Sequence, residues 1–351
     1  MPRNLLANAE GVQMVDKRPA DLRVAVLGTG LIGGSILLGL REAGIDVAGW
    51  DPDPEAVSYA RQHGIEFFER LADAVAGRDV VVLAGPLSTL PDNLAEVAGH
   101  TDPGCVITDV GSVKAPIARY AQANGWLDRF VPGHPMAGSE HSGLTAADPT
   151  LFDDAAWVLC PQPGAPLAPF RVLTALITTA LKAKVVPLSP ETHDDIVAMS
   201  SHIPHLLAGS LAGSVARSAL RQGVLSLAAG SFRDGTRVAG TRSARTVDML
   251  THNRDAITKS VHLAQRFLAD LADALERDDV AALTAAFDEA HGLRQELMGR
   301  DLQPSAERFR MDALGADELD FLTRLGAAGG HLTACAVDGD TVTYTALRPA
   351  S

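Results

Sequence analysis

A glycine-rich hexapeptide, Gly28–Gly33 (GTGLIG), limits the folds open to this chain. It directly follows the apolar run Val24–Leu27 and opens the helical pattern Ile32–Ala43. A GxGxxG motif between a buried strand and a helix allows a tight turn, close approach of a pyrophosphate to the backbone, and close packing of the helix on the strand. The N–H groups at the start of the helix can then bind the anion. We therefore expect the following residues to bind a dinucleotide: Gly28, Thr29, Gly30, Leu31, Ile32 and Gly33.

Asp51 ends the next apolar strand, 18 residues after Gly33. A carboxylate at this point accepts hydrogen bonds from the adenosine ribose diol and repels a 2′-phosphate, so we expect NAD rather than NADP. Asp53 precedes Pro54 and is typical of a helix cap, so we give it no ligand role.

Apolar runs alternate with helical patterns through the first half of the chain. The expected strands are Val24–Leu27, Asp46–Trp50, Asp79–Leu83, Cys105–Val110, Arg129–Val131, Ala156–Cys160 and Lys184–Pro187. This alternation predicts an α/β fold with a doubly wound parallel sheet, a Rossmann domain over residues 22–188. Long amphipathic patterns then predict an all-helical domain over 189–300. Residues 301–351 form an extension in which Asp338-Gly339 predicts a β-hairpin.

Composition excludes several classes of protein. The 351 residues carry 30 Lys and Arg against 43 Asp and Glu, a net charge of −13, which gives no general attraction to nucleic acid. No apolar stretch is long enough for a membrane span, and the first 21 residues lack the apolar core of a signal peptide. Three widely spaced cysteines predict no disulfide framework and no structural zinc site. We expect a soluble, cytoplasmic protein without a metal.

Three polar or glycine-containing segments follow predicted strands at the edge where ligands of parallel sheets bind: Ala84–Pro86, Gly111–Lys114 and Gly133–Gly138. Gly85, Pro86 and Ser112 are therefore candidates for cofactor contacts. His134 is the candidate general base, since imidazole can accept a hydroxyl proton while hydride leaves the same carbon. A purely structural hydrogen bond is the alternative role for this histidine.

Asp194, Ser201 and His205 share one face of an ideal helix to within about 20°, with His202 about 80° away. Pro204 predicts a kink beside them. They are candidates for ligand contact, the alternative being a solvated polar stripe. No metal-binding spacing such as HExxH is present. Farther along, Gly230–Arg237 has the composition of a polar loop, and its pattern does not decide between Arg233 and Arg237 as a ligand for a carboxylate.

Together these segments resemble the prephenate/arogenate dehydrogenase family of tyrosine biosynthesis, from about Val24 to Phe267. The motifs that carry the resemblance are GTGLIGGS (28–35), TDVGSVK (108–114), GHPMAGSEHSG (133–143), THDDIVAMSSHIPH (192–205) and GSFRDGTRVAG (230–240). The resemblance implies a Rossmann domain followed by a helical domain that forms a homodimer, with the site in the interdomain cleft. Its substrate would be prephenate or a similar small dianion.

The resemblance also implies residue roles. His134 is the catalytic base, Ser112 positions it against the hydroxyl and the nicotinamide, and Arg237 binds a substrate carboxylate. The remaining implied substrate-binding residues are His205, Ser201, Asp194, Ser139 and Glu140. In the implied reaction, NAD⁺ takes hydride from ring C4 of prephenate, His134 takes the hydroxyl proton, and loss of CO₂ yields aromatic 4-hydroxyphenylpyruvate.

Three alternatives stay open. Arogenate or 4-amino-4-deoxyprephenate differs from prephenate by an amino group that the sequence does not place. A β-hydroxyacid dehydrogenase would need a lysine that Asp194–His205 lacks. A non-catalytic dinucleotide sensor is disfavoured because Ser112, His134 and Arg237 are all present.

The chain departs from the family pattern at two places. Thr246 stands where many members have tryptophan, which affects the expected substrate wall. The tail is too short for a complete regulatory ACT domain, although tyrosine could still compete at the active site. Because both expected ligands are anions, we also expect positive potential near them from Arg237, Lys114 and helix N-termini.

Overall fold

The computed structural model describes residues 17–138, 143–311 and 315–350. The chain divides into two compact units. Among the described residues, those of 17–193 and 303–348 form the first unit, and those of 194–302 with 349 and 350 form the second.

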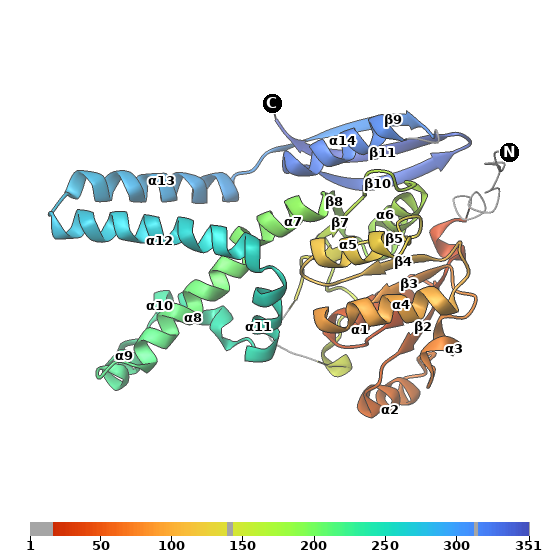
Figure 1. The fold of residues 1–351 in the computed structure, drawn as a ribbon, viewed down its shortest axis with the longest axis horizontal. Coiled ribbons are helices and arrows are strands. Elements are labelled where there is room, and N and C mark those ends of the chain that lie inside the picture. Colours follow the sequence, from red (N-terminus) through yellow and green to blue (C-terminus); the bar gives the residue numbers. More distant parts are fainter. Residues whose placement is uncertain (1–16, 139–142, 312–314, 351) are drawn as a thin grey trace. The chain divides into compact units, whose positions relative to one another are not determined.

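A five-stranded parallel sheet lies in the first unit, in the order β2-β1-β3-β4-β5. Figure 1 labels β2, β3, β4 and β5 of this sheet. Its strands are β1 (Arg23–Leu27), β2 (Asp46–Trp50), β3 (Val80–Leu83), β4 (Val106–Asp109) and β5 (Phe130–Val131). The strand order runs outward in both directions from β1, and every pairing is parallel. The doubly wound sheet expected from the sequence is confirmed.

Both faces of this sheet are buried, which explains why its strands are apolar along their whole length. Val24 and Val26 of β1 belong to one apolar core, and Ala25 and Leu27 belong to another. The first core also contains residues of α1 (Leu31–Glu42) and α6 (Ala168–Ala180). The second contains residues of α3 (Leu71–Val75), α4 (Leu90–His100) and α5 (Ala115–Ala123). Helix α2 (Pro54–Gln62) starts at Asp53, whose side chain accepts a hydrogen bond from Glu55 N, so the predicted cap is confirmed.

A second sheet, which the sequence did not predict, completes the first unit in the order β6-β7-β8-β10-β11-β9. Its strands are β6 (Gly133–Pro135), β7 (Ala156–Leu159), β8 (Lys184–Pro187), β9 (Leu302–Arg310), β10 (His331–Asp338) and β11 (Thr341–Pro349), and α14 (Ala316–Ala327) precedes β10. The predicted hairpin is present, with Gly339 at φ +57° between β10 and β11. Leu332 of β10 pairs with Val185 of β8, so the C-terminal segment extends a sheet begun much earlier in the chain.

A buried polar cluster fastens this C-terminal segment. Arg171 of α6 forms an ion pair with Glu318 of α14, and the Tyr344 hydroxyl donates to Glu318 Oε1 at 2.7 Å. Burial raises the pKa of Tyr344 well above its ordinary value. Leu322 and Leu332 belong to the same core as β1. Residues 303–348 are therefore an integral part of the first unit.

The second unit is built from helices. They are α8 (Ile203–Ala216), α9 (Arg221–Leu227), α10 (Gly230–Thr236), α11 (Ser243–His252), α12 (Arg254–Glu276) and α13 (Val280–Met298). Helix α7 (Pro190–Val197) crosses the boundary between the units and leads into a π-helical turn, Ala198–His202.

Short 3-10 helices occur at Pro19–Asp21, Leu87–Thr89, Leu144–Ala146 and Arg237–Gly240. None of the helices within residues 17–138, 143–311 and 315–350 combines the length and apolar character of a membrane span.

Candidate active site

In the glycine loop after β1, Gly28 and Gly33 leave no room for a side chain, whereas Gly30 does. Gly28 has φ +90°, and a Cβ there would lie 2.8 Å from the carbonyl carbon of Ala84. A Cβ on Gly33 would lie 1.9 Å from the carbonyl oxygen of Gly28. A Cβ on Gly30 would meet nothing within 4 Å, and no side chain caps the N-terminus of α1. The loop thus has the open backbone and uncapped N–H groups that suit a pyrophosphate.

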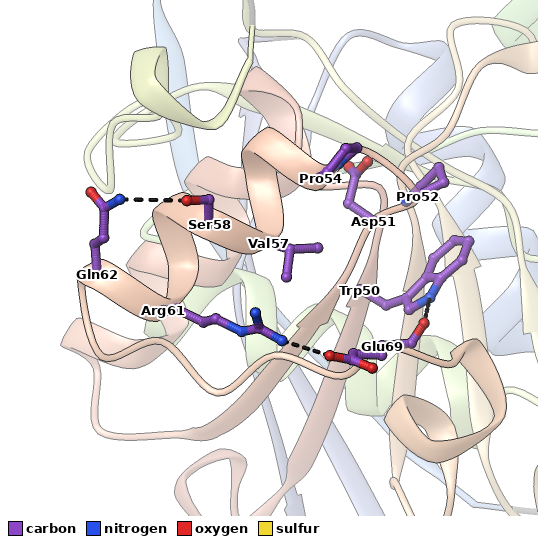
Figure 2. A pocket seen from close by; sticks show the side chains of 9 residues that line it. All are labelled: Trp50, Asp51, Pro52, Pro54, Val57, Ser58, Arg61, Gln62 and Glu69. Atoms are coloured by element: carbon purple, nitrogen blue, oxygen red, sulfur yellow. Dashed lines mark hydrogen bonds and ion pairs between the residues drawn. The ribbon is translucent and has the colours of Figure 1, made fainter.

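Asp51 lies at the end of β2, beside this loop. Its Oδ2 accepts hydrogen bonds from Thr29 N at 2.5 Å and from Thr29 Oγ1 at 3.2 Å, and its Oδ1 accepts from Asp53 N at 2.9 Å. These bonds hold a half-buried carboxylate next to the loop. Asp51 also lines an open hollow of about 660 Å³ between the end of β2 and α2, where Arg61 and Glu69 form an ion pair (Figure 2).

Asp109, at the end of β4, joins the two segments that carry Ser112 and His134. Its carboxylate accepts from Gly111 N at 2.9 Å and from Gly133 N at 3.1 Å. Lys114 forms an ion pair with the same carboxylate and also donates to the carbonyl of Gly133 at 2.7 Å. Neither charged side chain is exposed. The expectation that Lys114 supplies positive potential to a ligand is therefore wrong, because Asp109 neutralises it in the interior.

Gly85 and Ser112 follow the carboxyl ends of β3 and β4, which pair in parallel with each other. β3 also pairs in parallel with β1, so both residues share an edge of the sheet with the glycine loop. Ser112 is half-buried and Pro86 is exposed at this edge. The structure thus brings these candidate cofactor residues to the edge where the sequence placed them.

His134 lies on β6, which belongs to the second sheet. Its Nδ1 is 2.8 Å from Nε2 of His193, and the two rings meet edge to face with their centroids 5.1 Å apart. His134 is half-buried, whereas His193 is not exposed at all. The sequence did not predict His193 as a site residue, because no hydrophobic or polar periodicity indicated it. Only the folded chain brings these histidines together from 59 positions apart.

The candidate ligand-binding residues of the second unit take part in two sets of hydrogen bonds. Asn253 Nδ2 donates to the carbonyl of Asp194 at 2.8 Å and lies 3.1 Å from His202 Nδ1. His205 Nδ1 lies 3.1 Å from the carbonyl of Ser201. The π-helical turn at 198–202 interrupts the ideal α-helical spacing from which a common face was expected, since a π-helix has a wider turn.

Arg237 begins the 3-10 helix Arg237–Gly240, directly after α10, and its side chain is exposed. The loop expected over 230–237 is therefore wrong, because the segment is helical. Arg233 is also exposed, so the exposure of the two arginines does not indicate which of them binds a carboxylate. Ser139 and Glu140 lie outside the described residues.

The parallel sheet, the glycine loop and the Asp51 carboxylate at the end of β2 define a dinucleotide-binding protein with a second, helical unit. Two family models match the chain: the nucleotide-binding domain of prephenate dehydrogenase over residues 36–186 and its dimerization domain over 189–289. Prephenate dehydrogenases of Lactococcus lactis MG1363 and Bacillus subtilis 168 are 32% and 33% identical over 282 and 281 residues. Each alignment covers 78% of this chain, and 77% and 76% of the respective relatives. The chain belongs to the prephenate dehydrogenase family.

A solved structure is similar as well. Prephenate dehydrogenase from A. aeolicus, in complex with hydroxyphenyl propionate and NAD⁺, superimposes with a TM-score of 0.72 at 26% identity, covering 79% of this chain and 98% of that one. Another relative, 28% identical over 78% of this chain and 84% of its own length, is the 4-amino-4-deoxyprephenate dehydrogenase of Streptomyces pristinaespiralis. The chain is an NAD-dependent oxidoreductase, and its relatives differ in substrate.

Proposed function

We propose that this protein oxidises and decarboxylates prephenate to 4-hydroxyphenylpyruvate. The observation that carries the proposal is Asp109, which bonds to the backbone of both Gly111 and Gly133 and so ties Ser112 and His134 to the edge of the sheet that carries the glycine loop. The relatives at 32% and 33% identity support prephenate as the substrate.

In the proposed reaction, His134 accepts the proton of the substrate hydroxyl at Nε2, because Nδ1 is engaged with His193. Ser112 orients this hydroxyl. NAD⁺ held by Gly28–Gly33 and Asp51 would supply the acceptor for the hydride that leaves ring C4. Loss of CO₂ makes the ring aromatic, so the side chains need only bind and orient the substrate during that step.

We propose that Gly28–Gly33, Asp51, Gly85, Pro86 and Ser112 hold the cofactor. The open backbone at Gly30 accommodates the pyrophosphate, and the Asp51 carboxylate receives the ribose hydroxyls. We also propose Arg237 as the partner of a substrate carboxylate. On the family resemblance, the remaining substrate-binding residues are His205, Ser201, Asp194, Ser139 and Glu140.

We infer that the protein is a homodimer that associates through its helical unit. None of the 19 residues of helix α13 is buried, and its apolar residues Phe287 and Leu293 have 62% and 69% of their surface exposed. Phe267 and Leu268 of α12 are also exposed, at 44% and 55%. Apolar surface of this extent on long helices is typical of an oligomer interface. The match to a dimerization domain supports the same inference.

A steady-state assay of NADH formation tests the proposal, with prephenate, arogenate and 4-amino-4-deoxyprephenate compared side by side. We expect the highest kcat/KM with prephenate, and a preference for either amino compound would overturn that assignment. His134→Asn should lose at least about 100-fold in kcat, the usual contribution of a general base. Arg237→Ala should raise KM for substrate, while Arg233→Ala, a change in the adjoining helix, should not.

A further inference from the structure

The contact between His134 and His193 is set by two separate elements. His134 pairs with Val158 in the second sheet, which fixes its backbone. His193 lies in the first turn of α7, where its own N–H bonds to the carbonyl of Ser189 at 2.9 Å. The Ser189 hydroxyl accepts a further bond from Thr192 N at 3.1 Å. Because the ring of His193 has no exposed surface, it cannot contact a ligand directly, whereas the half-buried His134 can.

Two neutral imidazoles 2.8 Å apart must share one N–H between the facing nitrogens. If His193 donates from Nε2, then Nδ1 of His134 is the acceptor and its proton lies on Nε2, which makes that atom useless as a base. If His134 donates from Nδ1, its Nε2 is unprotonated and carries a lone pair. Only the second arrangement leaves His134 able to take a proton from a substrate hydroxyl.

We propose that His193 is a positioning residue that holds His134 in its Nδ1–H tautomer, an inference that rests on the proposed role of His134 as the base. His193 then carries its own proton on Nδ1 and accepts at Nε2. When His134 takes the substrate proton at Nε2, its Nδ1–H bond to His193 becomes charge-assisted and therefore stronger. His193 thereby orients the base and stabilises its protonated form, as the buried acid of a catalytic triad does for its histidine.

Two variants separate this role from simple packing. His193→Phe keeps an aromatic ring but removes the acceptor, whereas His193→Gln can place an amide oxygen near the position of Nε2. His100→Gln changes an exposed histidine on α4 and serves as the control. We expect kcat of His193→Phe to fall by about 10- to 100-fold with KM nearly unchanged, by analogy with the loss of a partner that orients a metal-bound histidine. His193→Gln should recover most of kcat, and His100→Gln should match the wild type.

Nitrogen-15 NMR of histidine-labelled protein reports the tautomer without any turnover. In the wild type and in His193→Gln, the His134 signals, assigned by their loss in His134→Asn, should show a protonated Nδ1 and a bare Nε2. In His193→Phe, the Nε2–H form should become populated. An Nε2–H tautomer in the wild type would overturn the inference, as would an unchanged kcat in His193→Phe. Absence of turnover with all three substrates, alongside the expected tautomer, would refute the proposed function and leave the tautomer assignment standing.

Discussion

Lys114 and Asp109 form an ion pair in which neither side chain is exposed. The pair lies between the segment of Ser112 and the strand of His134, because Asp109 bonds to the backbone of both Gly111 and Gly133. This arrangement makes Lys114 part of the protein framework rather than a group that faces a ligand. Its buried charges also make it sensitive to substitution.

Lys114→Met should destabilise the protein by about 3–5 kcal/mol, since it leaves the Asp109 carboxylate buried without its counter-ion. Adding Asp109→Asn should recover part of this loss, because the buried charge is then gone while the amide oxygen can still accept one of the two backbone bonds. Urea unfolding of the two variants measures the difference. A double variant less stable than Lys114→Met alone would contradict the argument.

Gly30 and Gly33 should respond differently to alanine. Gly33→Ala forces a Cβ to within 1.9 Å of the Gly28 carbonyl oxygen, so it should lower both the melting temperature and the affinity for NAD. Gly30→Ala meets no atom within 4 Å, so it should keep the melting temperature but weaken NAD binding by about tenfold or more, because its methyl group occupies the approach of the pyrophosphate. Calorimetric titration and thermal unfolding measure the two properties, with Gly99→Ala on α4 as a control that should not weaken NAD binding or lower the melting temperature.

Asp51→Asn should reduce the preference for NAD over NADP by about tenfold or more, because the change removes the negative charge facing a 2′-phosphate. The measurement is kcat/KM for each cofactor. Asp53→Asn is the matched control, since asparagine caps a helix as well as aspartate does and this residue has no proposed ligand role. Equal changes in both variants would refute the assignment of Asp51.

Glu318→Gln should lower the free energy of unfolding by about 3 kcal/mol, since Arg171 loses its buried counter-ion. Asp320→Asn, on the same helix, breaks an exposed pair with Arg324 and should cost less than about 0.5 kcal/mol. Urea unfolding, followed by a signal from the first unit, measures the free energy of unfolding of both variants. Similar losses would mean that the C-terminal segment contributes little to that unit.

Alkaline pH should weaken the fold through two thiols. Burial raises the pKa of Cys105 and of Cys335 from 9.0 to about 12. Both thiols hold their protons more tightly in the folded state, so their contribution to stability is complete below pH 9 and declines as pH rises from 9 toward 12. A Cys105→Ala, Cys335→Ala variant should therefore lose less stability than the wild type between pH 8 and 10, measured by unfolding under reducing conditions. Parallel losses would contradict the role of the thiols.

Local patterns were sufficient for much of the fold and for part of the site. The strand, glycine turn and helix at Val24–Ala43, the capping role of Asp53 and the hairpin at Asp338-Gly339 all depend on residues close together in the chain, and the structure confirms them. The parallel sheet followed because apolar strands must be covered on both faces. The ideal helical spacing of Asp194 and Ser201 was less reliable, because Ser201 lies within the π-helical turn Ala198–His202.

The sequence by itself determined the cofactor motif, the parallel sheet and the candidate base His134, since each is set by short-range backbone rules or by residue type. Tertiary structure alone decided that His193 contacts His134, that Lys114 is neutralised by Asp109, and that residues 303–348 belong to the first unit. The physical reason is the same in each case. Burial and partner choice depend on strands and helices that meet across long separations in the chain, and no local pattern encodes which ones will meet.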